Sequence, residues 1–480
     1  MSKQKKFALT FDDISIVPGY SQILPGEVDV STRLTKSIKL NIPIISAAMD
    51  TVTEEKMAIA MAQQGGIGII HQYLSPEEQA DQVRRVKRYE SWIIDNPITI
   101  ESNKTIGAAK KIMRENQISG IPVVEKGKLI GIITKRDILF VKNDNLKVEE
   151  LMTRKLVTVN KDITRDKAKQ ILQKNKIEKL LVTEKGKLIG LITVKDILRK
   201  EKYPNAIRDS EGRLMVGAAV GVGDMKRVEL LCKEDVDVIV VDSAHGHSKN
   251  VLNTVKQIKK NFDIDVIGGN VVTAKAADDL IAVGVDAVKV GLGAGSICTT
   301  RVVTGVGVPQ VTAIEDCTEV ADKYDIPVIS DGGIKQYGDI AKAIAAGASS
   351  VMIGGLLAGT EESPGRKVLL EGRLYKEYRG MGSESALEAR YGPGRYFLQS
   401  KGKTVPEGVE GLVDFVGTTS EVLYDMIGGL RHAMGYTGIK TLEEFRKKTT
   451  LIEVSVSGQK ESHPSVRITK EPRNYRAFPV

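Results

Sequence analysis

The chain has 480 residues, enough for two or more hydrophobic cores, and its content of 41% hydrophobic and 27% charged residues is that of an ordinary globular protein. Its three cysteines are widely spaced and odd in number, which excludes a disulfide framework and a Cys-x-x-Cys metal motif and favours a reducing compartment. The formal net charge of +9 comes from scattered lysines with few interleaved aromatics, so no specific nucleic-acid site is indicated. We find no signal-peptide-like segment and no apolar run near the ~18 residues that span a membrane, and we expect a cytoplasmic protein without membrane association.

Short apolar segments alternate with helical stretches along most of the chain. Their continuously apolar character is typical of parallel strands buried on both faces. The segments are PIISAAM (43–49), GIGIIH (66–71), LMVGAAVG (214–221), VDVIVVDS (236–243), DVIGGN (265–270), AVKVGL (287–292), IPVISDGG (326–333) and SVMIGG (350–355). Eight such β-then-α units predict an α/β fold with a closed TIM (β/α)8 barrel, in which loops after the strands carry the chemistry.

One internal repeat interrupts this rhythm. The segment EKGKLIG at 125–131 recurs letter for letter at 184–190. Each unit reads as strand, amphipathic helix, strand, Lys-Gly-Lys turn and strand, and repeats of this kind stack on each other to bury a shared apolar face. We therefore expect a small domain at 93–200, with one repeat at about 93–150 and the other at about 151–200. It divides the barrel into residues 1–92 and 201–480.

Polar residues and glycine pairs follow several predicted barrel strands. A carboxylate at the end of an apolar strand either faces the barrel mouth or caps the next helix, and convergence on one rim favours a site. Glycine pairs after strands seven and eight favour phosphate binding through backbone N–H groups. These residues are Asp242, Ser243, Asn270, Asp331, Gly332, Gly333, Gly354 and Gly355.

Cys298 lies in the glycine-rich stretch GLGAGSICTTRVVTGVGVPQ (291–310), directly after the sixth predicted strand. A lone cysteine is often a buried core residue, but a thiol presented on a loop beside Thr300 can be a nucleophile. The run GLGAGS does not fit a dinucleotide fingerprint, because no acidic residue follows on a second strand about twenty residues on. His245 and His247 lie near Asp242 without a zinc-ligand spacing, so a polar rim is favoured over a metal site.

The segment 374–417 departs from the barrel pattern. It is rich in Gly, Arg and Tyr and is too long for a simple connection, so we expect a functional flap. Arg395 and Tyr396 are the charged and aromatic groups that such a flap would deliver to the site.

Several co-linear segments resemble the inosine-5′-monophosphate (IMP) dehydrogenase family over essentially the whole chain. They are TFDDISIVPG, SAAMDTVTE, VVDSAHGHS, GSICTTR, GVGVPQ, SDGGI, LLAGTEESPG, YRGMGS, GRYF, VPEGVEG and ESHPS. The inserted repeat resembles a pair of CBS modules, a Bateman domain, with Thr134/Asp137 and Thr193/Asp196 as the usual Thr-x-x-Asp endings. Ala294 stands where many relatives carry proline.

The resemblance implies oxidation of IMP to xanthosine 5′-monophosphate (XMP), a step of guanine nucleotide synthesis. Cys298 would attack C2 of the hypoxanthine ring, hydride would pass to NAD⁺, and water would hydrolyse the adduct. Arg395 with Tyr396 would activate that water, supported by Thr300 and Glu407.

The resemblance also assigns binding roles, a potassium ion and an assembly. The substrate would contact Ser296, Asp331, Gly332, Gly333, Gly354, Gly355, Tyr378, Met381, Gly382 and Glu407. NAD would contact Asp242, Ser243, Asn270, Gly291 and Gly293. K⁺ would be bound by carbonyls of Gly293, Gly295 and Cys298 with Glu461, Ser462 and His463 of the partner subunit. The family implies a homotetramer or octamer, with adenine or guanine nucleotides at the CBS pair.

Two other functions compete with this hypothesis. GMP reductase shares the barrel and the cysteine loop but deaminates GMP reductively with NADPH; the long flap and the ESHPS tail favour the dehydrogenase. A non-catalytic nucleotide sensor would keep the repeats and lose the thiol or the flap, and both are present.

Overall fold

The computed structural model describes residues 7–89, 93–95, 97–116, 118–194, 197–198, 202–388, 405–470, 472 and 474–475. The chain divides into two compact units. One comprises Met1–Tyr89 and Asn205–Val480, and the other comprises Glu90–Pro204. No helix among the described residues is both long enough and apolar enough to cross a membrane.

The larger unit is a closed barrel of eight parallel strands, in the order β13-β14-β15-β16-β17-β18-β4-β5 around the ring. This confirms the predicted barrel, and each strand lies within one of the eight apolar segments, except that β15 extends one residue beyond its segment. They are β4 (Ile44–Ser46), β5 (Ile67–Ile70), β13 (Gly217–Val220), β14 (Val238–Asp242), β15 (Asp265–Val271), β16 (Ala287–Val290), β17 (Val328–Asp331) and β18 (Ser350–Ile353). Every residue of β5, β13, β14, β16 and β18 is buried, because barrel side chains meet either the interior or the surrounding helices.

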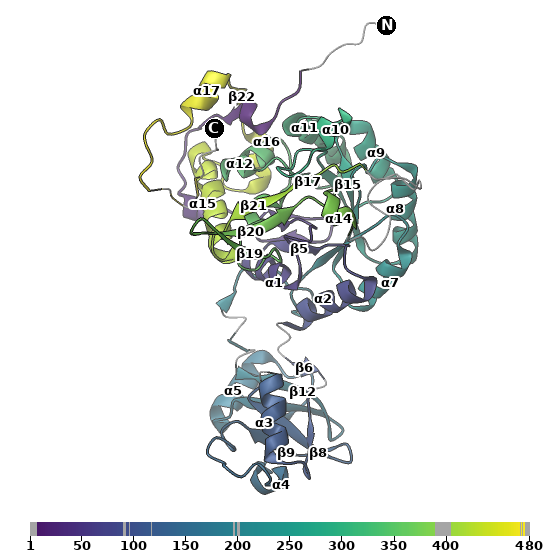
Figure 1. Ribbon diagram of the computed structural model, residues 1–480, viewed down its shortest axis with the longest axis vertical. Coiled ribbons are helices and arrows are strands. Elements are labelled where there is room, and N and C mark those ends of the chain that lie inside the picture. Colours follow the sequence, from purple (N-terminus) through teal and green to yellow (C-terminus); the bar gives the residue numbers. More distant parts are fainter. Residues whose placement is uncertain are drawn as a thin grey trace. The chain divides into compact units, whose positions relative to one another are not determined.

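Helices surround these strands (Figure 1). They are α1 (Glu55–Gln64), α2 (Pro76–Tyr89), α7 (Met225–Lys233), α8 (Lys249–Asn261), α9 (Ala274–Ala282), α11 (Gln310–Ala321), α12 (Gly338–Ala345) and α15 (Thr419–Thr437). Several begin at a side-chain cap: Ser248 accepts from the Val251 N–H, and Thr273 accepts from the Ala276 N–H. Two short helices, α10 (Thr300–Thr304) and α13 (Gly355–Ala358), follow β16 and β18 at the barrel mouth.

Both ends of the segment 374–417 form regular secondary structure, which its composition did not predict. Strand β20 (Arg373–Arg379) pairs with β19 (Lys367–Leu370) and with β21 (Glu410–Asp414) in an antiparallel sheet. A short helix, α14 (Glu384–Glu388), follows β20. Arg395 and Tyr396 lie outside the described residues. Shorter elements of the same unit are β1 (Ile14–Ile16), β2 (Thr32–Arg33), β3 (Lys39–Leu40), α16 (Leu442–Lys448), β22 (Leu451–Glu453) and α17 (Val456–Glu461).

The smaller unit contains the sequence repeat as two similar supersecondary structures. The first has β7 (Ile100–Glu101), α3 (Ile106–Glu115), β8 (Gly120–Glu125), β9 (Lys128–Thr134) and α4 (Val148–Leu151). The second has β10 (Thr158–Val159), α5 (Arg165–Asn175), β11 (Lys179–Glu184) and β12 (Lys187–Thr193), and β6 (Ile94–Asp95) pairs with β12. Both hairpins turn at a Lys-Gly pair with positive φ at both residues, which is the geometry of a type I′ turn.

Candidate active site

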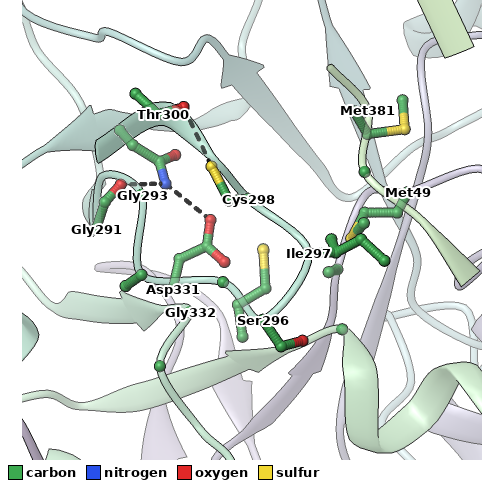
Figure 2. Close-up of a pocket in the computed structure, with 18 of the residues that line it drawn as sticks. Met49, Gly291, Gly293, Ser296, Ile297, Cys298, Thr300, Asp331, Gly332 and Met381 are labelled. Atoms are coloured by element: carbon green, nitrogen blue, oxygen red, sulfur yellow. Dashed lines mark hydrogen bonds between the residues drawn. The ribbon is translucent and has the colours of Figure 1, made fainter. Parts of the chain in front are cut away.

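A pocket opens at the carboxyl ends of the barrel strands and brings together residues that are far apart in the sequence. It is lined by every predicted substrate residue and by most predicted NAD residues. The predicted residues in the lining are Ser243, Asn270, Gly291, Gly293, Gly295, Ser296, Cys298, Thr300, Asp331, Gly332, Gly333, Gly354, Gly355, Tyr378, Met381, Gly382 and Glu407. Figure 2 shows Cys298 and Thr300 on the loop after β16, with Asp331 and Gly332 beside them.

Cys298 is the half-buried thiol of this pocket. Its Sγ lies 3.1 Å from the Thr300 hydroxyl, which in turn donates to Oε2 of Glu407 at 2.8 Å. The Cys298 Sγ also lies 3.6 Å from the Glu407 carbonyl oxygen. By contrast, Cys317 is fully buried, and burial raises the pKa of its thiol to about 12. The core interpretation therefore fits Cys317, whereas Cys298 faces a cavity and has a hydroxyl and a carboxylate nearby.

Two features hold the Cys298 loop in its conformation: a close approach of the backbone at Gly291 and hydrogen bonds from the Arg301 side chain. At Gly291, an added Cβ would lie 2.0 Å from the Asp331 carbonyl oxygen, so the ends of β16 and β17 approach as closely as they do only with glycine there. The Arg301 guanidinium donates to the Leu292 carbonyl at 2.7 Å and to the Val308 carbonyl at 2.5 Å, closing the loop on itself. Burial lowers the pKa of Arg301 from its usual value, although the neighbouring Cys298 acts in the opposite direction.

Backbone hydrogen bonds join this loop to residues 407–409, at one end of the segment 374–417. The N–H of Thr299 donates to the Glu407 carbonyl at 3.0 Å, and the N–H of Val409 donates to the Ile297 carbonyl at 3.0 Å. The Glu407 N–H donates to the Gly382 carbonyl at 2.9 Å, which joins residues 407–409 to the turn at residues 380–383. The thiol of Cys298, the carboxylate of Glu407 and the residues predicted to bind the purine are thus brought together by main-chain contacts.

A buried lysine that sequence reasoning missed connects the opposite side of the pocket. Lys289, in β16, donates to Asp331 Oδ2 at 2.7 Å, to Asp242 Oδ1 at 3.2 Å and to the side-chain oxygen of Asn270. Its side chain is 3% exposed, and that of Asp242 is 4% exposed. Asn270 donates to Asp331 Oδ2 at 2.9 Å and to the Gly291 carbonyl at 2.7 Å. The sequence did contain an indication of this cluster: a lysine lies within the apolar run AVKV, and a charge inside a buried strand requires partners.

This arrangement settles how the two strand-end aspartates are used. Neither one caps a helix: Ser248 caps α8, and Asp339 accepts the N–H groups of Lys335 and Gln336 before α12. Asp331 lines the pocket, as expected for a rim residue. Asp242 does not line it and is buried beneath it with Lys289, which corrects the expectation that Asp242 faces the barrel mouth.

The glycine pair after β18 forms a shallow cradle with two hydroxyl groups. A Cβ added at Gly354 would lie 2.8 Å from the Tyr378 hydroxyl, and one added at Gly355 would lie 3.2 Å from the Ser296 hydroxyl. Burial raises the pKa of Tyr378, so its hydroxyl remains protonated and able to donate. Hydroxyl donors beside exposed backbone suit an anion such as a phosphate.

The histidines on the β14–α8 loop do not form a metal site with their neighbours. His247 Nε2 lies 2.8 Å from Asp279 Oδ2 on α9. Within the described ranges, no three His, Cys, Asp or Glu side chains gather as ligands for a metal ion. The polar-rim interpretation of this loop stays a prediction, and the contact of His247 with Asp279 is compatible with it.

Comparisons with known proteins agree with this arrangement. The family model described as the IMP dehydrogenase / GMP reductase domain matches residues 8–465. The chain is 54% identical to inosine-5′-monophosphate dehydrogenase of Aquifex aeolicus, covering 99% of both chains, and 52% identical to that of Bacillus subtilis, again covering 99% of both. A crystal structure of a cysteine-to-alanine variant of GMP reductase from Trypanosoma brucei with guanosine 5′-monophosphate has a TM-score of 0.91 at 39% identity, covering 97% of this chain and 99% of that chain. The chain therefore belongs to the IMP dehydrogenase / GMP reductase family.

Proposed function

We propose that this protein oxidises IMP to XMP with NAD⁺ as the hydride acceptor. The observation that carries this proposal is the pocket in which Cys298, Thr300 and Glu407 are joined by short contacts at the mouth of the barrel. The full-length relatives named as IMP dehydrogenases support the same chemistry at 51–54% identity.

In the first step, Cys298 Sγ forms a bond to C2 of the hypoxanthine ring. The hydrogen on C2 leaves with its electron pair and reduces NAD⁺ to NADH, which leaves a covalent purine–enzyme adduct. The thiol must give up its proton for this attack, because the thiolate is the nucleophile. The Thr300 hydroxyl lies 3.1 Å from the sulfur and donates to the Glu407 carboxylate at 2.8 Å.

In the second step, water adds to C2, the S–C2 bond breaks, and XMP and the free thiol are released. We assign the orientation of this water to Thr300 and Glu407, which are hydrogen-bonded to each other beside the thiol. The family assigns activation of this water to Arg395 with Tyr396. Because arginine stays protonated in proteins, that role needs either a surrounding network or a transiently deprotonated guanidinium.

The remaining lining residues divide the substrate among three regions. We assign the phosphate to Ser296, Gly333, Gly354, Gly355 and Tyr378. Asp331 and Gly332 face the ribose, and Met381, Gly382 and Glu407 contact the base. Ser243, Asn270, Gly291 and Gly293 would contact the nicotinamide riboside, with Asp242 acting from below through Lys289.

The donor set of the Cys298 loop fits a potassium ion. The carbonyl oxygens of Gly293 and Cys298 accept no hydrogen bond from any described residue, whereas the Gly295 carbonyl accepts one from the Cys298 N–H at 3.1 Å. Hard carbonyl oxygens suit such an ion. Glu461, Ser462 and His463 of the partner subunit would complete the site, which requires a tetramer or octamer. When bound, K⁺ would stabilise the conformation of the loop that presents Cys298.

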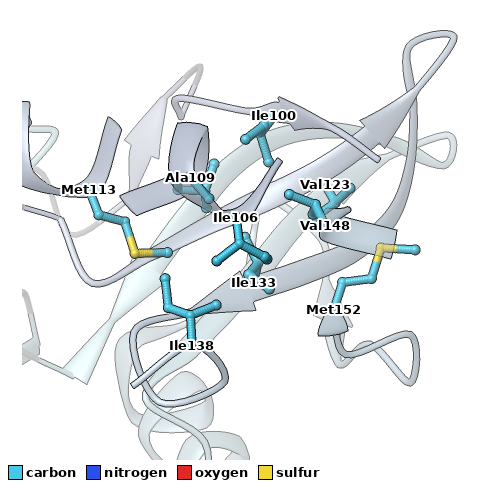
Figure 3. Packing of buried hydrophobic residues seen from close by; sticks show 10 residues of the cluster. Ile100, Ile106, Ala109, Met113, Val123, Ile133, Ile138, Val148 and Met152 are labelled. Carbon is cyan, nitrogen blue, oxygen red and sulfur yellow. The ribbon is translucent and has the colours of Figure 1, made fainter. Parts of the chain in front are cut away.

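The inserted unit has features of a nucleotide-binding CBS pair. Its first repeat is built on a buried cluster in which Ile106, Val123 and Ile133 pack between α3 and the hairpin (Figure 3). A neighbouring cavity is lined by Thr134, Asp137 and four cationic side chains, those of Lys135, Arg136, Lys176 and Lys179. Asp137 accepts from the Thr134 N–H and hydroxyl, both at 2.7 Å. The four cationic side chains outnumber the carboxylates of Asp137 and Glu178 in this lining, which supports a phosphate-bearing ligand, and we propose an adenine or guanine nucleotide. Asp196 of the second repeat lies outside the described residues.

One assay tests the proposed activity against its nearest rival. We expect NADH absorbance to rise with IMP and NAD⁺, and no NADPH consumption with GMP. The opposite pattern would identify a GMP reductase, and no turnover with either pair would favour the non-catalytic sensor.

The spacing of the three free cysteines supports a cytoplasmic location.

A further inference from the structure

The loop between β5 and α2 contacts the segment that we assign to the purine base. Tyr73, in this loop, donates its hydroxyl hydrogen bond to the Met381 carbonyl oxygen at 2.6 Å. The Tyr73 N–H donates to Nδ1 of the buried His71 at 3.1 Å, which fixes the backbone from which the ring extends. A side chain from the second barrel strand's loop thus reaches a main-chain atom more than three hundred residues away.

The contacted peptide is the centre of a tight turn. The Ser383 N–H donates to the Gly380 carbonyl at 2.9 Å, so residues 380–383 form a β-turn with Met381 and Gly382 at its central positions. Types I and II of such a turn differ in the orientation of this central peptide, and type II requires a positive φ at the third residue. Gly382 is not among the residues with positive φ. A glycine there can nevertheless adopt either turn, so the sequence leaves the orientation open.

The hydrogen bonds on either side of the turn do not involve the carbonyl of Met381 or the N–H of Gly382, the two groups of the central peptide. The Gly380 N–H donates to the Val409 carbonyl at 3.0 Å, and the Gly382 carbonyl accepts from Glu407. The Arg379 N–H donates to the Thr51 hydroxyl at 3.2 Å. Among the described residues, the contact that engages the Met381 carbonyl is the one from Tyr73.

The orientation of this peptide determines where a donor points. In a trans peptide the carbonyl and the following N–H point in opposite directions, so a Met381 carbonyl held by Tyr73 directs the Gly382 N–H to the other side. Gly382 is buried and lines the pocket, and its N–H donates to no described residue. We propose that Tyr73 is a positioning residue that selects the turn conformer in which the Gly382 N–H is presented to the purine base.

This proposal rests on the assignment of residues 380–382 to the base, and it predicts a specific defect. Tyr73→Phe keeps the ring and removes the hydroxyl. Losing one neutral hydrogen bond corresponds to about three- to tenfold weaker binding. We therefore expect both the KM and the calorimetric Kd for IMP to rise by this factor. We expect kcat to change less than twofold, because the lost contact acts on the bound substrate before and during the reaction. Ribose 5-phosphate lacks the base, so its inhibition constant should stay the same.

Thr51→Val is the matched control, because it removes a hydrogen bond to the same segment at residue 379 instead of 381. The proposal is supported if only Tyr73→Phe weakens IMP relative to ribose 5-phosphate. It is overturned if IMP affinity is unchanged, if both ligands weaken together, or if Thr51→Val has the same selective effect. NADH formation by the unmodified enzyme tests the proposed function separately, since the Tyr73 comparison can be read from IMP binding alone.

Discussion

The two sides of the catalytic pocket are held together in different ways. On one side, Lys289 binds Asp242 and Asp331 through buried charges within the barrel wall. On the other side, Cys298 and Glu407 are brought together by main-chain hydrogen bonds between loops that are distant in sequence. The charged side is built from strand residues, whereas the thiol side depends on segments outside the barrel.

This difference matches the tasks that the reaction sets. The ribose and the nicotinamide must keep a fixed geometry during hydride transfer, because small displacements of reacting groups cost large factors in rate. In the proposed reaction, the thiol side accepts two partners in turn, NAD⁺ and then water. Loops joined by single backbone hydrogen bonds can rearrange at lower cost than a buried ion cluster. Substitutions on each side should therefore produce defects of different kinds.

Cys298→Ala should give the largest effect on the thiol side. Without the nucleophile no covalent adduct forms, and we expect NADH production from IMP to fall at least about a thousandfold. Steady-state absorbance at the NADH band measures this loss. Cys232→Ala is the control, because Cys232 lies on α7 away from the pocket and burial raises the pKa of its thiol to about 11. Equal activity of Cys298→Ala and the unmodified enzyme would contradict the nucleophile assignment.

Lys289→Met should damage the charged side in both stability and activity. Removing the cation leaves two carboxylates close together in a buried site, and breaking a buried pair costs about 3–5 kcal/mol. We expect a lower Tm by calorimetry and a decrease in kcat/KM of about a hundredfold or more.

A second substitution tests whether the loss of Tm in Lys289→Met comes from the unpaired carboxylates or from altered packing. Adding Asp242→Asn to Lys289→Met removes one of the unpaired carboxylates and should restore part of the lost Tm. Lys226→Met is the surface control, because its pair with Glu77 is exposed and screened by solvent. An unchanged Tm in Lys289→Met would show that the cluster does not stabilise the barrel.

Sequence patterns were sufficient to predict the barrel and the position of its site. Continuous apolar runs identify parallel strands, and the end of each run places Ser243, Asn270, Asp331 and Cys298 on one rim. The letter-for-letter repeat at 125–131 and 184–190 likewise identified the inserted unit, since it required no knowledge of tertiary contacts.

Contacts between loops were beyond such patterns. The 2.8 Å contact of Thr300 with Glu407 depends on how residues 405–409 pair with 297–299, and no local periodicity encodes that pairing. The same holds for Tyr73 and Met381. Asp242 was misplaced for a related reason: its partner Lys289 lies two strands away in the barrel, so the buried ion cluster forms only once the barrel is closed.

Thr300→Val should give the smallest defect of the three and the most selective one. Valine has nearly the shape of threonine, so the buried position stays filled while the hydroxyl between Cys298 Sγ and Glu407 Oε2 is lost. If this hydroxyl orients the hydrolytic water, kcat should fall about ten- to a hundredfold, in the range of general acid–base effects. A pre-steady-state burst of NADH should persist, because hydride transfer precedes hydrolysis. Thr300→Ser keeps the hydroxyl and should retain most of the activity. Loss of the burst together with kcat would instead place Thr300 in the activation of the thiol, and the two halves of the reaction would then share one proton route.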